Sequence, residues 1–260
     1  MEKAAIKGTN HYLKDVVDYY RTTQGDLTVV EADGRIVGIG KLTLLFDGSA
    51  WLELLRVHPD YQRRGCGMAI YREYLRQIQA FGCPAARMYT GAQNIPSASL
   101  AQRNGLHRGC QFHGMTLERS GELPSAPQSF RHLTGEEALS ALLPLKEVYQ
   151  FFNINQTYYE INEATILGFA AAGWVYGDGQ GSALVAGCRF QPRKGLYVAA
   201  VTGNSDAALA YARYLAALAG QEKILTHFPA ESEALAALYR RHGFRDNPSD
   251  LVVYQWIKPV

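Results

Sequence analysis

The sequence lacks the features of membrane, secreted and nucleic-acid-binding proteins. Residues 1–10 hold no apolar core of a signal peptide, and no apolar run is long enough to span a bilayer. The longest apolar stretches, near 166–175 and 207–219, are interrupted by Gly173 and Arg213. The net charge is +2 and no basic tract occurs, so we expect neither nucleic acid nor a membrane as a partner.

Cysteine and histidine are scattered rather than paired. The four cysteines and seven histidines include no C-x-x-C pair and no spacing typical of zinc ligands. We therefore expect free thiols, no metal site and a cytoplasmic location. The cysteines are Cys66, Cys83, Cys110 and Cys188.

Two common phosphate-binding motifs are also missing. The G-x-x-x-x-G-K-[ST] loop of nucleoside-triphosphate enzymes does not occur. The dinucleotide fingerprint would need a third glycine at position 70, which is Ile70. The 260 residues are 47% apolar and 19% charged, as is usual for a globular protein with one large or two small cores.

What the sequence does contain is a basic loop between an apolar run, Trp51–Val57, and a helical pattern, Met68–Phe81. Backbone N–H groups at the start of a helix lack intrahelical partners and lie at the positive end of the macrodipole, so a pyrophosphate fits there. Two glycines let the backbone approach such a ligand, and two arginines add charge. The loop consists of Gln62, Arg63, Arg64, Gly65, Cys66, Gly67 and Met68.

The order of residues around this loop closely resembles the acyl-CoA loop of the GNAT superfamily of N-acetyltransferases. The pattern is Gln62-x-x-Gly65-x-Gly67, preceded by Val57–Tyr61. A second segment, Asn94–Leu106, is similar to a helix that GNAT proteins carry, with a capping asparagine at its start and a glycine just past its end.

The second half of the chain repeats this plan. Leu238–Phe244 matches Leu100–Leu106 in the spacing of its residues, which indicates an internal duplication. The corresponding loop, Thr202–Asp206, has neither the glutamine–glycine pattern nor arginines, and we interpret it as an N-cap turn. We predict an α/β (α+β) fold of two tandem GNAT-like domains, 1–122 and a degenerate 123–260, each a mixed, largely antiparallel sheet flanked by helices.

Turn residues divide the chain further. Asp33-Gly34 predicts a hairpin between two strands. A second hairpin is expected about Gly114, within 107–118, and residues 120–127 have the composition of a linker. The tyrosines and phenylalanines of 149–159 indicate a buried core, or alternatively the lining of an acceptor cleft.

The resemblance implies how acetyl-CoA would be held. The amides of residues 63–68 would hold the pyrophosphate, and the strand edge at 55–57 would pair with the pantetheine arm as an added strand does. The Val57 amide would donate to the thioester carbonyl, where charge develops during attack. The implied cofactor-binding residues are Leu55, Arg56, Val57, Gln62, Arg63, Arg64, Gly65, Cys66, Gly67, Met68, Asn94, Ser97 and Arg103.

Glu53 is the candidate general base, because a protonated amine must lose a proton before it attacks. Strand alternation would place Glu53 on one face with Leu55 and Val57. A carboxylate in so apolar a strand is costly unless it is paired or functional, and several GNAT enzymes have a base at a similar position. Alternatively, Glu53 only pairs with a nearby arginine or hydroxyl.

The departing CoA thiolate lacks its usual proton donor. GNAT proteins usually supply it from a tyrosine at the position of Ala101. Three alternatives stay open. A water or a hydroxyl such as Tyr89 or Ser99 replaces the tyrosine, the thiolate leaves unprotonated, or the domain binds acyl-CoA without catalysis.

The sequence therefore predicts an acetyl-CoA-dependent N-acetyltransferase that acts on the primary amine of a small acceptor by direct attack on the thioester. The alternative is a non-catalytic acyl-CoA-binding protein with a regulatory or scaffold role. A third interpretation is a protein that binds nucleotide phosphates. A homodimer is left open by the sequence.

Overall fold

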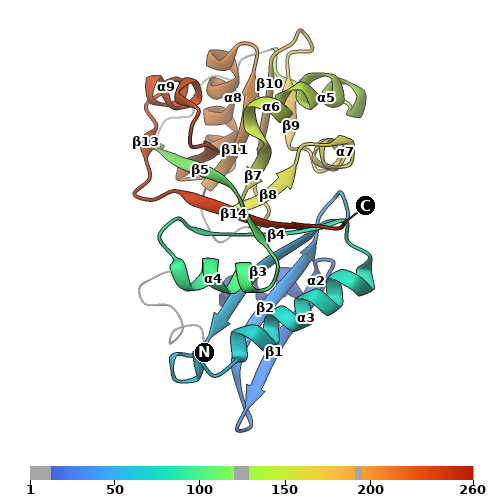
Figure 1. Ribbon diagram of the computed structural model, residues 1–260. Coiled ribbons are helices and arrows are strands. Elements are labelled where there is room, and N and C mark those ends of the chain that lie inside the picture. The colour runs from blue at the N-terminus through green and yellow to red at the C-terminus, as the bar shows by residue number, and fades with distance from the viewer. Residues whose placement is uncertain (1–12, 120–128, 191–194, 260) are drawn as a thin grey trace. The chain divides into compact units, whose positions relative to one another are not determined.

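The structure is a computed structural model that describes residues 13–119, 129–190 and 195–259 (Figure 1). The chain forms two compact units, Met1–Gly109 with Val253–Val260, and Cys110–Val252. The sequence prediction instead placed a single boundary after residue 122. The linker predicted at 120–127 lies outside the described residues.

The first unit is built on a sheet whose neighbouring strands follow the order β1, β2, β3, β4 and β14. The first three strands are antiparallel, and β3 and β4 are parallel. All but the first two residues of β14, at the end of the chain, belong to this unit. The strands are β1 (Leu27–Ala32), β2 (Arg35–Leu44), β3 (Ala50–Val57), β4 (Ala85–Gly91) and β14 (Leu251–Ile257).

Local chemistry explains the elements of this unit that the sequence predicted. Asp33 and Gly34 both have positive φ, 52° and 68°, as the tight turn between β1 and β2 requires. The predicted helix begins two residues earlier, at Cys66, and ends at Phe81 before a left-handed Gly82. The helices of the unit are α2 (Leu13–Thr22), α3 (Cys66–Phe81) and α4 (Ile95–Arg103).

Helices α2 and α3 lie on opposite faces of this sheet. A Cβ at Gly40 of β2 would lie within 3 Å of Ile70 and Tyr74 atoms, so this position faces α3. The next residue, Lys41, donates from Nζ to the carbonyl oxygen of Thr23 at the end of α2 (3.2 Å). Successive residues of a strand point to opposite faces, so Lys41 lies on the face that α2 covers.

The second unit repeats the order strand, loop, helix, parallel strand, helix. In the first unit these are β3, α3, β4 and α4, and in the second β11, α8, β12 and α9. Its sheet runs β5, β12, β11, β10, β9 and β6, with β13 also beside β5, and every pairing except β11–β12 is antiparallel. The strands are β5 (His107–Glu118), β6 (Arg131–His132), β9 (Val175–Gly177), β10 (Ala183–Gly187), β11 (Gly195–Thr202), β12 (Lys223–Pro229) and β13 (Arg245–Asp246). The helices are α5 (Gly135–Leu142), α6 (Lys146–Tyr149), α7 (Glu163–Ala171), α8 (Ser205–Leu218) and α9 (Glu233–Arg241).

The hairpin predicted about Gly114 is wrong, because β5 runs unbroken from His107 to Glu118. Gly114 lies in the middle of this strand, directly opposite His227 of β12. A Cβ at Gly114 would lie 2.9 Å from His227 Nε2 and 2.6 Å from Asn247 Nδ2. The glycine therefore permits a close approach of side chains rather than a turn.

The aromatic residues of 149–159 are buried in the second unit. They belong to the end of α6 and to a separate hairpin of β7 (Phe151–Ile154) and β8 (Thr157–Glu160), which the sequence did not predict. This burial agrees with a core role for the group. All four cysteines are free thiols, as predicted. Within the described residues, no helix is long and apolar enough to cross a membrane.

Candidate active site

The basic loop leaves a set of backbone donors exposed at the start of α3. A short 3-10 turn, Pro59–Tyr61, follows β3, and Arg63 and Gly65 then adopt positive φ, 59° and 88°. Gly65 is the N-cap of α3 and offers no side chain to cap it. Across the described part of the chain, no group accepts a hydrogen bond from the backbone N–H groups of 63–68. The loop therefore presents a row of unpaired donors at the positive end of a helix.

Side chains tie the loop to the end of β3 and to the β1–β2 turn. Gln62 donates from Nε2 to the carbonyl oxygen of Val57 (3.2 Å). The Arg64 guanidinium lies over the ring of Tyr61, 5.3 Å from its centroid, and Tyr61 donates to Asp33 Oδ2 (3.1 Å). The hydrogen bond to Asp33 raises the pKa of Tyr61, so this donor stays protonated.

The two loop glycines serve different purposes. A Cβ at Gly65 would meet nothing within 4 Å, so this glycine is needed for its positive φ alone. A Cβ at Gly67 would lie 3.1 Å from Leu100 Cδ2, so this glycine lets α4 pack against the start of α3. Asn104 strengthens the contact by donating to Met68 Sδ (3.3 Å) and to the Leu100 carbonyl oxygen (2.7 Å).

Helix α4 has the cap that the sequence predicted. Asn94 is its N-cap and accepts a hydrogen bond from the backbone N–H of Ser97 at Oδ1 (3.3 Å). Arg103 is exposed in the last turn of the helix. Ala101 is fully buried, and its methyl group has no proton to give to a departing thiolate. Of the replacement donors considered, Tyr89 lies in β4 and stacks its ring on Trp51 (centroids 6.1 Å apart), and Ser99 lies within α4.

Strand β3 contains a bulge that the sequence did not predict. Ile39 pairs with Arg56 and Lys41 with Glu53, so two residues of β3 oppose Gly40. One of them is Leu54, whose φ is 63°. The expectation that Glu53 shares a face with Leu55 and Val57 by simple alternation is therefore wrong, because the extra residue interrupts the alternation.

Tyr74 of α3 fills the bulge with its hydroxyl. This hydroxyl donates to the carbonyl oxygen of Glu53 (3.0 Å) and accepts from the backbone N–H of Lys41. Burial raises the pKa of Tyr74 well above its usual range, which keeps the hydroxyl neutral. A Cβ at Gly40 would lie 2.3 Å from the tyrosine oxygen, so the bulge and the glycine depend on each other.

The carboxylate of Glu53 is held by two hydroxyls. Tyr20 of α2 donates to Oε2 (3.2 Å), and Thr43 of β2 donates to Oε1 (2.6 Å). Both donors are buried, whereas Glu53 itself is half-buried. These two contacts agree with the alternative that Glu53 pairs with nearby hydroxyls. A fixed and partly exposed carboxylate can also act as a base.

On the side of β3 that faces β4, no strand of the described residues pairs with β3 beyond Trp51. The β3–β4 ladder covers Ala50 and Trp51 alone. Val57 pairs with Gly38, and the neighbouring His58 N–H donates to the Val37 carbonyl oxygen (2.8 Å). Hydrogen-bonded and non-bonded pairs alternate in an antiparallel ladder, so the N–H and C=O of Val57 point away from β2 and toward this open edge. Leu55 and Arg56 belong to the same stretch, and Arg56 folds back to donate to the Leu55 carbonyl oxygen (3.1 Å).

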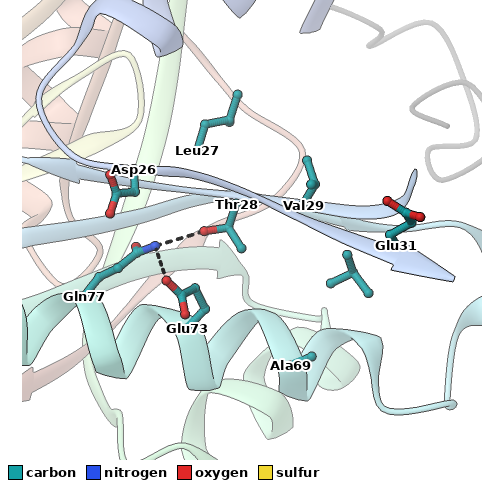
Figure 2. A pocket seen from close by; sticks show the side chains of 9 residues that line it. Asp26, Leu27, Thr28, Val29, Glu31, Ala69, Glu73 and Gln77 are labelled. Carbon is teal, nitrogen blue, oxygen red and sulfur yellow. Dashed lines mark hydrogen bonds between the residues drawn. The ribbon is translucent and has the colours of Figure 1, made fainter. Parts of the chain in front are cut away.

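A groove of about 550 Å³ lies between β1 and α3, apart from these residues (Figure 2). It is lined by residues 26–31 with Ala69, Glu73 and Gln77, and includes none of the predicted site residues. Gln77 spans it by donating to Thr28 Oγ1 and to Glu73 Oε1, both at 3.0 Å. No group of three or more side chains suited to holding a metal occurs among the residues that the structure describes.

Sequence and structure comparisons agree with this geometry. Residues 6–106 match the model of the acetyltransferase (GNAT) family. A comparison with curated protein sequences found no match. Three solved structures share the fold. One is a protein from Thermoplasma acidophilum (19% identity, TM-score 0.61, covering 96% of this chain and 85% of that one). Another is a GCN5-related N-acetyltransferase from Sphaerobacter thermophilus (14% identity, TM-score 0.61, covering 95% of this chain and 86% of that one).

The third is a tandem GNAT protein from the clavulanic acid biosynthesis pathway (15% identity, TM-score 0.53, 89% of this chain and 82% of that one). At these identities the solved structures establish the fold, and the family model identifies the first unit. Residues 6–106 of the first unit therefore match the acetyltransferase (GNAT) family, and the chain has the fold of solved structures that include a tandem GNAT protein.

Proposed function

We propose that the chain is an acetyl-CoA-dependent N-acetyltransferase that acts on the primary amine of a small acceptor. One observation carries the proposal. The unpaired N–H groups of 63–68 at the start of α3 lie directly after the strand edge that ends at Val57. A diphosphate needs several donors at a helix N-terminus, and an extended pantetheine arm needs an open strand edge, so the arrangement provides for both.

Each predicted cofactor residue has a place in this scheme. The N–H groups of 63–68 bind the diphosphate, with Arg63 and Arg64 exposed beside them. The pantetheine arm lies along the β3 edge at 55–57. Gln62 holds the Val57 carbonyl, which leaves the Val57 N–H to donate to the thioester oxygen. Arg56, Asn94, Ser97 and Arg103 are proposed as further contacts of the cofactor.

The reaction requires two protons to leave the acceptor. Glu53 takes one from the acceptor ammonium through a water, and the freed nitrogen lone pair attacks the thioester carbonyl carbon. The C–S bond then breaks as the amide forms, and the second proton of the nitrogen goes to the CoA thiolate. Because Ala101 has no proton to give, a water or the Tyr89 or Ser99 hydroxyl relays this second proton.

The test measures CoA thiol release from acetyl-CoA with a panel of small amines, and acetyl-CoA binding by calorimetry. We expect turnover with at least one primary amine. Gly65→Val and Gly67→Val should each weaken acetyl-CoA binding by roughly tenfold or more, since a Cβ forces the loop out of its conformation or displaces α4. Gly82→Ala at the other end of α3, also at positive φ with open space around it, is the matched control.

The outcomes separate the candidate functions. Unchanged affinity in both loop variants would show that the proposed acetyl-CoA site is wrong. Tight binding without turnover for any amine would instead identify a non-catalytic acyl-CoA-binding protein. Competition by ATP or NAD for the same loop would favour a binder of nucleotide phosphates.

A further inference from the structure

A lysine is buried beside the proposed base. Lys41 of β2 has 0% of its surface exposed. Its partner in the β2–β3 ladder is Glu53. Directly opposite residues of an antiparallel ladder carry their side chains on the same face, with Cβ atoms about 5 Å apart. The ammonium and the carboxylate therefore belong to one layer between the sheet and α2, in which the lysine is buried and the glutamate is half-buried.

The same layer contains the groups that hold both charges. The Lys41 ammonium donates to the Thr23 carbonyl oxygen (3.2 Å), and the Glu53 carboxylate accepts from Tyr20 and Thr43. Lys41 and Glu53 thus both reach the C-terminal turn of α2, Lys41 through a backbone group and Glu53 through a tyrosine. The position of α2 on the sheet and the orientation of the carboxylate are coupled through these contacts.

Burying an ammonium group costs free energy of desolvation. Removing an ion from water costs several kcal/mol even in a relaxed protein. A methionine would fill the same volume without that cost. A carboxylate at the directly opposite position is suited to compensate this charge, which would make the lysine useful where that carboxylate must be ionised.

We propose that Lys41 is a positioning residue for Glu53, which keeps the carboxylate charged and turned toward the acceptor. This inference rests on the proposed function, because it assigns Glu53 as the base. The Lys41 ammonium does not touch the acceptor. It acts by holding the negative charge of Glu53 in the layer between the sheet and α2 until the acceptor proton arrives.

Other charged or titratable groups also face Glu53. Tyr20 lies on it from α2, Tyr74 lies behind its backbone from α3, and Arg56 follows three residues later in β3. Burial raises the pKa of Tyr74 well above its usual range, so its hydroxyl stays neutral. Arg56 is the second cation near this strand, so the effect of Lys41 is measured with Arg56 left intact.

The experiment measures kcat and KM against pH in the full chain for Lys41→Met and Lys41→Arg, with Glu53→Gln as the reference. Glu53→Gln should lower kcat by about 10²-fold, the size of a general-base contribution. Lys41→Met should lower kcat at pH 7 by roughly tenfold with an unchanged KM for acetyl-CoA. The acidic limb of its rate profile should move to higher pH, because loss of the cation disfavours the ionised carboxylate. Lys41→Arg should recover most of the rate.

Controls separate positioning from stability. Lys223→Met removes an exposed lysine that pairs with Glu118 in the second unit (2.8 Å), and should change neither kcat nor the profile. Thermal unfolding and acetyl-CoA affinity show whether each variant is folded. Lys41→Gln is the second neutral variant if Lys41→Met does not fold.

A neutral variant with the rate and pH profile of the unchanged protein would overturn the inference. So would equal losses in Lys41→Met and Lys41→Arg without any shift of the profile, because that pattern indicates a structural role. Loss of activity in Glu53→Gln together with normal activity in Lys41→Met leaves the proposed function standing and removes this inference alone. Absence of turnover in the unchanged protein removes both.

Discussion

The two units contain the same parallel strand pair, and its edge is open in one and filled in the other. The β3–β4 ladder stops at Trp51 and Arg87, and the β11–β12 ladder stops at Val198 and Thr226. Near the end of each first strand is a valine whose N–H and C=O face the side of the second strand. In the first unit this residue is Val57, and Gln62 bonds its carbonyl.

In the second unit a tyrosine occupies the equivalent edge. Tyr149, at the end of α6, donates to the Val201 carbonyl oxygen (3.1 Å) and accepts from the Val201 N–H (3.2 Å). Burial raises the pKa of Tyr149 well above its usual range, so the hydroxyl remains both donor and acceptor. The group that would receive a thioester oxygen is therefore satisfied within the protein.

The helices that follow the two strands, α3 and α8, also differ in whether a side chain satisfies their first N–H groups. Asn204 caps α8 by accepting from the Ala207 N–H (3.1 Å), whereas Gly65 leaves α3 uncapped. Tyr239, which has the position that Ala101 has in the first unit, is fully buried between Phe228 and Phe244 (centroids 5.4 and 5.2 Å away). Apart from the Val57 carbonyl, one unit leaves these polar backbone groups without protein partners in the described residues, and the other satisfies them with its own side chains.

The largest effect is expected from removing the tyrosine hydroxyl that fills the second edge. Tyr149→Phe leaves the N–H and C=O of Val201 buried without partners, which should destabilise the protein by about 2–4 kcal/mol. Chemical unfolding measures this loss. Acetyl-CoA binding should stay at one site per chain with unchanged affinity, because the groups that we propose to bind it belong to the first unit.

Tyr214→Phe is the matched control, since Tyr214 is a half-buried tyrosine of α8. It should cost far less than Tyr149→Phe. A second bound acetyl-CoA in Tyr149→Phe would mean that the tyrosine alone closes an otherwise competent site. A stability equal to that of the unchanged protein would contradict the role assigned to the hydroxyl.

The parts of the fold that the sequence predicted depend on short-range chemistry. The Asp33-Gly34 turn, the Asn94 cap and the start of α3 each follow from residues a few positions apart. The loop glycines were identified for the same reason, because the motif is contiguous. The loop with unpaired donors at 63–68, where we propose that a diphosphate binds, could thus be located from the sequence.

The features that the sequence missed depend on residues far apart in the chain. The bulge at Leu54 in β3 depends on Gly40 of β2 and Tyr74 of α3, which lie close to each other only in the folded protein. The unbroken β5 depends on β12, which supplies His227 opposite Gly114. The filled edge of the second unit needs Tyr149, about fifty residues before Val201. Such pairings leave no pattern among neighbouring residues of the sequence, so only the folded structure identifies them.

A smaller effect is expected at the helix caps. Asn204→Ala and Asn94→Ala remove side-chain caps of the same type, and each should cost about 1 kcal/mol of stability. They should differ in binding. Asn94→Ala should also weaken acetyl-CoA binding, because we place Asn94 against the cofactor, whereas Asn204→Ala should leave the affinity unchanged. Equal affinities in the two variants would remove Asn94 from the proposed site.

The smallest effect concerns the pH dependence of the second unit. His113 of β5 lies between Asp250 at Nδ1 and Asp246 at Nε2, both at 2.8 Å. Burial alone would lower the pKa of His113, but the hydrogen bonds and charges of the two carboxylates outweigh it, so the pKa is raised. Arg240 also donates to Asp246 (2.9 Å) and helps to hold the pKa of that carboxyl at about 2.

Since the folded protein binds the His113 proton more tightly than the unfolded chain, the stabilisation is fully present below about pH 6.5 and is lost as the pH rises through the raised value. His227 behaves in the opposite way. Burial, and then the charge of His113, lower its pKa to about 4, so its contribution is lost as the pH falls from about 6.5 toward 4. His113→Gln should therefore reduce the loss of stability above pH 6.5 and leave the acid side governed by His227. Unfolding free energies measured between pH 5 and 8, roughly the range over which histidines titrate, provide the check, and parallel curves for the two proteins would contradict the assignment.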